Sequence, residues 1–224
     1  MTRTIVERMA QAARAAREGG KVAAGDVVRP RRLATVDGPP VAVPDPDRLV
    51  HLQLRRFAGC PVCNLHLRSV VRRHDEVTAA GVREVVVFHS TADALRPHAA
   101  DLPFAVVPDP GKELYRAFGV ESSPRAVLDP RAWPAIVRGV ARVLAEAARG
   151  RRAALRLDAR GGRLGLPADV LVAPSGRVVA AHYGVHAGDQ WTVDEVLAHA
   201  AAAGRGRSGG PGAGELAGRG RSMA

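Results

Sequence analysis

The stretch LVHLQLRRFAGCPVC, residues 49–63, decides how the fold is interpreted. Residues 49–57 favour a β-strand, and a glycine then allows a sharp turn before the CPVC motif that runs from Cys60 to Cys63. Over residues 60–80 apolar side chains recur near one helical face, and a glycine ends the pattern. The sequence therefore predicts a strand, a turn and a helix over residues 60–80, with both cysteines in its first turn.

The spacing of the two cysteines favours redox chemistry. Side chains three residues apart on a helix lie on the same side, so the sulfurs of Cys60 and Cys63 can form a disulfide. The unpaired N–H groups and the dipole at a helix N-terminus favour an anion, so Cys60 should ionise more readily than a free cysteine. We expect Cys60 to be the nucleophile and Cys63, one turn deeper, the resolving thiol.

Other interpretations of these cysteines remain open. Cys60, Cys63 and His66 offer three of the four ligands of a structural zinc site, but the sequence has no second Cys/His pair at finger spacing. The two cysteines could also be inert and buried, and His66 could either tune Cys63 or lie on the helix surface. Asn64 after Cys63 excludes a haem-attachment motif. The redox interpretation is favoured, with no metal and no cofactor.

Strand and helix patterns alternate along the rest of the chain. They predict an α/β fold with a central mixed β-sheet and helices on both faces. A capping box, Thr192 with Glu195, marks the start of the last helix. The predicted elements are a hairpin at 32–43, strands at 84–89 and 104–107, helices at 92–100 and 111–118, a hairpin at 170–183 and a helix at 192–203.

An inserted helical segment occupies about residues 130–160. From Trp133 to Ala147 the apolar residues fall on one helical face, and the arginines of residues 133–149 mostly avoid that face. We expect this face to cover the sheet or a partner in a homodimer. A helix lying on a membrane surface is the alternative.

The two ends are expected to lie outside the main domain, residues 25–203. Residues 1–24 predict an amphipathic surface helix, and residues 204–224, which are mostly glycine, arginine, serine and alanine, predict a disordered tail. No apolar run is long enough to span a membrane, and residues 1–20 have no apolar core of a secretory signal. A cytoplasmic protein is the expectation.

The net charge of +11 raises the question of nucleic-acid binding. The basic residues are almost all arginines, scattered from Arg3 to Arg221 without a dominant cluster or interleaved aromatic residues. Weak, salt-sensitive binding is the most that this pattern predicts, and no specific nucleic-acid partner is expected.

Two stretches carry a resemblance to a known family. RRFAGCPVC, residues 55–63, resembles the Phe-Arg-Gly-x-x-Cys-Pro-x-Cys segment of the peroxiredoxin-like branch of the AhpC/TSA (alkyl hydroperoxide reductase and thiol-specific antioxidant) family, within the thioredoxin-like superfamily. GLPADVLV at 165–172, with GRVV at 176–179 and the Tyr183-Gly184 pair, resembles its β-hairpin. The resemblance implies a thioredoxin-like fold and a thiol-dependent oxidoreductase, whose reductant is a thiol of the thioredoxin or glutathione type.

The resemblance also implies further site residues. Pro167 would be a cis-proline that exposes the Leu166 backbone to a bound substrate. An arginine usually completes such sites, and Arg125 and Arg163 are the candidates.

The chain departs from true peroxiredoxins close to the cysteine. Those enzymes carry a proline and a threonine or serine seven and three residues before the reactive cysteine, where this chain has Gln53 and Phe57. Peroxide reduction and exchange with a protein or small-molecule disulfide therefore stay open as alternatives. The rival from another class is a non-catalytic binding or scaffold module of the same fold.

Overall fold

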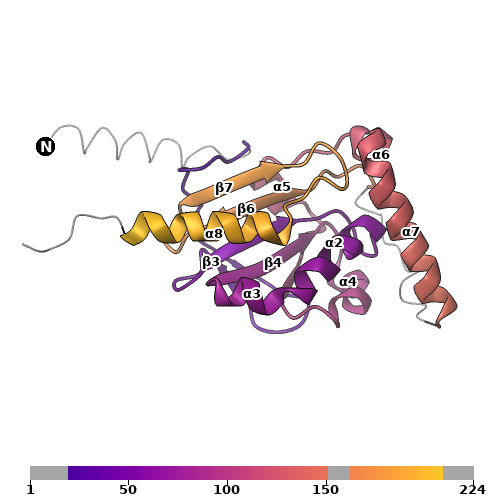
Figure 1. Cartoon of the computed structure of the whole chain (residues 1–224), viewed down its shortest axis with the longest axis horizontal. Helices are drawn as coiled ribbons and strands as arrows, with labels where there is room; N and C mark the ends of the chain where they lie inside the picture. Colours follow the sequence, from indigo (N-terminus) through magenta and orange to yellow (C-terminus); the bar gives the residue numbers. More distant parts are fainter. Residues whose placement is uncertain (1–19, 151–161, 209–224) are drawn as a thin grey trace, which may run out of the picture.

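The computed structural model describes residues 20–150 and 162–208 (Figure 1). Most of the predicted N-terminal helix and most of the predicted tail lie outside the described residues. None of the helices in the described part is long and apolar enough to cross a membrane.

A five-stranded mixed sheet forms the centre of the fold, in the order β5-β4-β3-β6-β7. β3 pairs in parallel with β4, which pairs in parallel with β5, whereas β6 is antiparallel to both β3 and β7. This arrangement confirms the predicted α/β class and mixed sheet. The strands are β3 Leu49–Leu54, β4 Val82–Phe88, β5 Ala105–Pro108, β6 Ala168–Val172 and β7 Val178–Tyr183, with a separate hairpin of β1 Arg31–Leu33 and β2 Val41–Val43.

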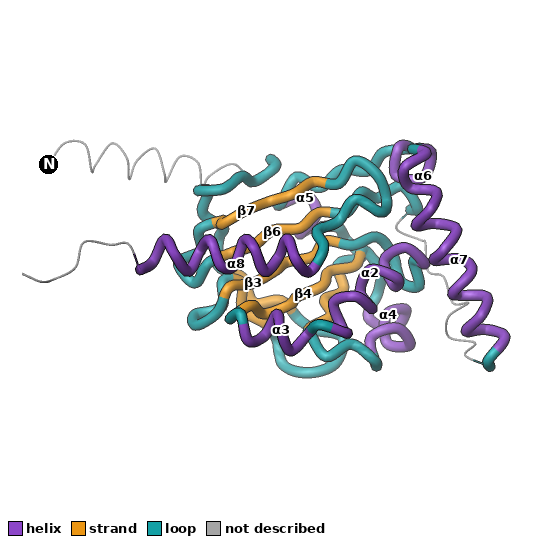
Figure 2. The backbone as a smooth tube through the Cα atoms, viewed as in Figure 1, coloured by secondary structure: helices purple, strands orange, loops and turns teal. Residues whose placement is uncertain are grey.

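Helices cover both faces of the sheet (Figures 1 and 2). α2, α3 and α8 lie over one face; α5 lies over the other, which it shares with the β1-β2 hairpin. Strands β3 and β4 are buried on both sides, which explains the apolar run VVVF at residues 85–88 of β4 and means that the polar residues of β3 need buried partners. The helices are α2 Pro61–Arg72, α3 His74–Ala79, α4 Ala92–Ala99, α5 Glu113–Ala117, α6 Arg125–Leu128, the 3-10 turn η1 Pro130–Ala132, α7 Trp133–Ala148 and α8 Val193–Ser208.

Two helix boundaries differ from the prediction. The single helix expected over residues 60–80 is broken at Arg73, whose backbone leaves helical geometry and whose guanidinium binds Glu76 and Asp194. Its side chain thereby ties α3 to the start of α8. The capping box of Thr192 and Glu195 is confirmed, but α8 continues to Ser208 instead of ending at residue 203.

Helix α7 stands at the side of the molecule against α2 (Figure 1). It packs through its small residues: Gly139 lies against Pro61, and Ala135 joins the apolar cluster around the cysteines. Of the two expected occupants of its apolar face, the sheet is wrong, because α7 packs on α2, and a homodimer partner stays a prediction. The side of α7 that carries Gly139 can approach α2 most closely and is therefore the side that packs. Trp133 and Val137, on another side, are exposed.

Candidate active site

The CPVC motif begins α2 at the carboxyl end of β3. Cys60 precedes the helix, Pro61 occupies its first turn, and the Cys60 sulfur accepts a hydrogen bond from the Cys63 N–H at 3.4 Å. The Cys63 thiol donates to the Cys60 sulfur across 2.8 Å, and both cysteines are reduced and fully buried. The two sulfurs therefore need little movement to form a disulfide.

Arg56 supplies the positive charge beside Cys60. Its Nη1 lies 3.8 Å from the Cys60 sulfur, its Nη2 donates to the carbonyl of Arg163, and its guanidinium lies 5.3 Å from the Phe57 ring centre. Among the described residues no carboxylate forms an ion pair with Arg56. Its charge therefore acts on the sulfur.

This environment separates the acidities of the two thiols. Burial alone would raise the pKa of Cys60, but the hydrogen bond from Cys63 and the charge of Arg56 outweigh it and lower the pKa to about 7. Burial and the neighbouring Cys60 raise the pKa of Cys63 well above its ordinary value. Near neutral pH a substantial fraction of Cys60 is thiolate while Cys63 keeps its proton.

Helix α7 closes the site from outside. A β-carbon at Gly139 would lie 2.8 Å from both the carbonyl carbon and the carbonyl oxygen of Pro61, a distance that no larger residue tolerates. An ion pair between Arg68 of α2 and Glu146 of α7, at 2.7 Å, holds the two helices together further along. The buried state of both thiols thus depends in part on a glycine far away in sequence.

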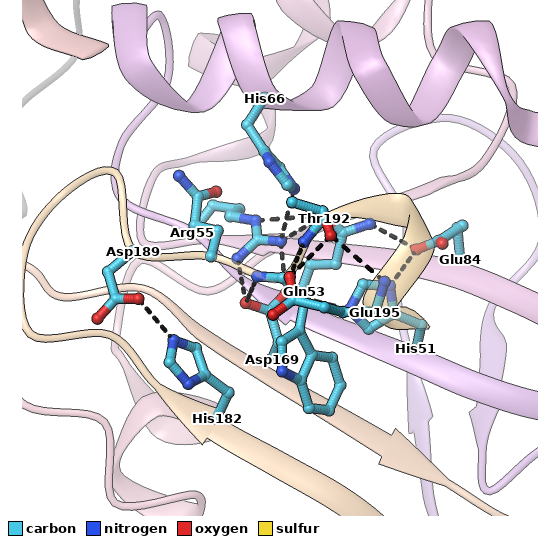
Figure 3. A network of polar contacts seen from close by, with 12 residues as sticks. His51, Gln53, Arg55, His66, Glu84, Asp169, His182, Asp189, Thr192 and Glu195 are labelled. Carbon is cyan, nitrogen blue, oxygen red and sulfur yellow. Dashed lines mark hydrogen bonds and ion pairs between the residues drawn. The ribbon is translucent and has the colours of Figure 1, made fainter. Parts of the chain in front are cut away.

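A buried network of charged and polar side chains lies under α2 and α8 (Figure 3). His51 donates from Nδ1 to Glu84 at 2.8 Å and from Nε2 to Asp169 at 3.0 Å, and Arg55 binds the same Asp169 at 2.6 Å. Gln53 accepts from Arg55 at 2.7 Å and donates to Glu84. Each charge in the network faces an opposite charge, as burial requires.

The acidities in the network fit this pairing. Burial alone would lower the pKa of His51, but Glu84 and Asp169 raise it to about 9, so the ring is a cation at neutral pH. Burial alone would raise the pKa of Asp169, but Arg55 and His51 hold it far below its usual range. Two cations and two carboxylates therefore balance beneath the helix.

His66 connects this network to the CPVC helix. Its Nε2 lies 3.2 Å from Arg55 Nη2, and burial together with the Arg55 charge lowers the pKa of the partly buried His66 to about 3. The ring is thus a neutral acceptor for Arg55. Because it is partly buried and bonded to Arg55, His66 is not a plain surface histidine, and among the described residues no group of three or more possible metal ligands gathers around it.

The resemblance was wrong about the conformation of Pro167. The only cis peptide bond in the described residues is Val43–Pro44, so the Leu166–Pro167 bond is trans. The segment is extended and paired instead: Leu166 donates its N–H to the carbonyl of Glu121, and Pro167 accepts from the Gly184 N–H. Binding of substrate by the Leu166 backbone stays a prediction. Since the Leu166 N–H is already bonded to Glu121, only the carbonyl could make that contact.

The predicted arginines do not bring a guanidinium to the sulfurs. Arg125 is exposed on α6, and the exposed Arg163 contributes its backbone carbonyl to Arg56. Sequence reasoning missed Arg56 as the site cation. Arg56 lies four residues before Cys60, just before the turn between β3 and α2, and this position is the signal that could have identified it.

Comparisons with known proteins agree with this fold. A family model described as "AhpC/TSA antioxidant enzyme" matches residues 69–186, a span that begins after the CPVC motif. A search of curated protein sequences finds no match.

Two solved structures show the same architecture. The peroxidoxin BcpB of Mycobacterium tuberculosis is similar with a TM-score of 0.56 and 14% identity, over 81% of this chain and 97% of that one. The reduced 2-Cys peroxiredoxin of Plasmodium vivax is similar with a TM-score of 0.58 and 12% identity, over 84% and 85% of the two chains. The fold is thus thioredoxin-like, and since the family model spans more than half of the sequence, the chain belongs to the AhpC/TSA antioxidant enzyme family.

Proposed function

We propose that this protein is a thiol oxidoreductase that reduces a small hydroperoxide with Cys60 as nucleophile and Cys63 as resolving thiol. The observation that carries the proposal is the Cys60 sulfur itself, placed 3.8 Å from Arg56 and 2.8 Å from the Cys63 thiol. A thiolate beside a cation is the nucleophile, and the protonated thiol in contact with it can attack the oxidised sulfur in the following step.

The reaction needs three steps. The Cys60 thiolate attacks the terminal oxygen of the peroxide, the O–O bond breaks, and the sulfur becomes a sulfenic acid while the alkoxide or hydroxide takes up a proton. Cys63 then attacks the sulfenic sulfur, which releases water and forms the Cys60–Cys63 disulfide. Two electrons from an external thiol reductant of the thioredoxin or glutathione type restore both thiols.

Burial of the site favours a small oxidant. Both cysteines are fully buried and α7 packs on Pro61 directly above them, so a peroxide reaches Cys60 with less displacement of α7 than a protein disulfide requires. Arg56 is also placed to stabilise the negative charge that develops on the departing oxygen.

One observation favours disulfide exchange as the second candidate. Phe57 is buried beside the site and brings no hydroxyl, and Gln53 is bound in the network with Glu84 and Arg55, so neither assists a peroxide. In that reaction the Cys60 thiolate would attack a disulfide, release one thiolate, and be freed from the mixed disulfide by Cys63.

Trapping the first product separates the two candidates. In Cys63→Ser, treated with one equivalent of hydrogen peroxide, we expect a dimedone adduct on Cys60, and none in Cys60→Ser. The rate of oxidation is compared with that of a small thiol of matched pKa. Faster oxidation supports peroxide reduction, whereas an equal rate together with mixed disulfides in Cys63→Ser supports exchange and contradicts the proposal.

A further inference from the structure

The outer face of α7 carries a stripe of large apolar side chains. Trp133 is 60% exposed, Val137 64%, Val140 42% and Leu144 59%, and Leu128 of the preceding α6 is 69% exposed at the same end. Exposed apolar residues are common singly, but a continuous stripe along one helix indicates a surface that binds another surface. We call these four residues of α7 the outer stripe.

The spacing of the outer stripe is that of a helix-pairing seam. Its residues are separated by four, three and four positions, the alternation found where two helices pack along their length. The sequence of spacings is the same in both directions. An antiparallel second copy of α7 would therefore set Trp133 against the partner's Leu144, and Val137 against the partner's Val140.

The charges around the outer stripe fit a protein partner better than a lipid surface. Arg138 donates to the carbonyl of Pro134 at 3.0 Å, Arg142 binds Glu146 at 3.1 Å, and both lie on the side away from the stripe. The exposed neighbours that flank the stripe, such as Ala141 and Ala148, are small and uncharged. A helix lying on a membrane would carry its cations at the edges of its apolar face.

We propose that the outer stripe is the interface of a homodimer, formed by antiparallel packing of α7 on α7 about a twofold axis near residues 138–139. The same patch meets itself, as a twofold interface requires. The seam is about 16 Å long. A single pair of helices in contact over this length buries less area than the ~1,200 Å² of the smaller specific interfaces, so we expect a dimer that dissociates on dilution.

Sedimentation velocity of the full chain over a range of concentrations tests the proposal. We expect the wild-type protein to change from monomer to dimer with rising concentration, and Val137→Asp to remain monomeric because it buries a charge in the seam. Ala202→Asp, an exposed position on α8, introduces the same charge far from α7 and should dimerise like the wild type.

Disulfide trapping tests the orientation. In a chain that also carries Cys60→Ser and Cys63→Ser, a mixture of Val137→Cys and Val140→Cys chains should cross-link, whereas Trp133→Cys chains should not link to each other. Cross-linking of Trp133→Cys would indicate parallel packing and overturn the proposed geometry. A monomer at every concentration would overturn the interface, as would a dimer unaffected by Val137→Asp. Binding of a monomer to anionic vesicles that Val137→Asp abolishes would assign the stripe to membranes instead.

Discussion

Arg55 and Arg56 are adjacent in the chain and both are buried, yet their surroundings differ in one respect. Arg55 lies under α2, where Asp169 takes up its charge through bonds to both carboxylate oxygens. Arg56 points the other way, toward Cys60, and in the part of the chain that the structure describes it meets a carbonyl and a sulfur but no carboxylate.

The difference explains how one dipeptide serves two purposes. A buried cation that is matched by a carboxylate has its charge compensated and contributes to the structure. A buried cation without a carboxylate favours any group nearby that can become an anion, and at this site that group is the Cys60 thiol. We therefore expect substitution of Arg55 to affect stability first, and substitution of Arg56 to affect the thiol first.

Arg55→Met should show the largest effect. It leaves the Asp169 carboxylate buried without its closest cation, and breaking such a pair typically costs about 3–5 kcal/mol of unfolding free energy. Urea denaturation measures the loss. Arg55→Met combined with Asp169→Leu should recover part of the stability, and no recovery in the double variant would mean that the pair is not the cause.

The charge on His51 should make the stability depend on pH. Its folded pKa is raised from 6.5 to about 9, so its contribution is fully present below pH 6.5 and is lost as the pH rises through 9. The shift corresponds to about 3 kcal/mol. Unfolding free energies are compared from pH 6 to about 10 in a chain carrying Cys60→Ser and Cys63→Ser, which removes the titration of the thiols. A flat profile would contradict the charge-balanced network.

Gly139→Val tests whether the packing of α7 on α2 keeps the thiol site closed, without changing the buried charged network. The larger side chain cannot fit against Pro61, so α7 is pushed away from α2 at a cost of about 1–3 kcal/mol. We expect Cys60 to react with a bulky thiol reagent about tenfold faster, because the opened state becomes more populated. Ala141→Val, exposed on the same helix, is the matched control. Equal reaction rates in both variants would show that α7 does not cover the site.

Sequence reasoning predicted most of the elements and the place of the two cysteines at the start of a helix because both rest on local patterns, whereas the redox role of the cysteines stays a prediction. The apolar run of β4 and the CPVC motif before α2 each have a local signature, and the structure places them as predicted. The polar residues of β3 have no such signature. His51 and Gln53 interrupt an apolar strand, and only the pairing of β3 with β4 and β6 brings Glu84 and Asp169 beside them.

The orientation of α7 illustrates the same limit. Its apolar face was recognised from the spacing of residues, but which face packs depends on Gly139, whose missing side chain matters only against the Pro61 backbone. The backbone partners of the segment at Pro167, Glu121 and Gly184, are likewise distant in sequence.

The central claim is that the hydrogen bond from Cys63 and the charge of Arg56 together hold Cys60 partly ionised near neutral pH, and a titration of the thiolate tests it most directly. The ultraviolet absorbance of the thiolate, followed against pH in the reduced full chain, should give a first midpoint at about 7, with Cys63 titrating far higher. In Arg56→Met the first midpoint should move toward the ~8.5 of an ordinary cysteine, and Arg56→Lys should keep much of the depression. A wild-type midpoint of ~8.5, or the same midpoint in wild type and Arg56→Met, would contradict the account.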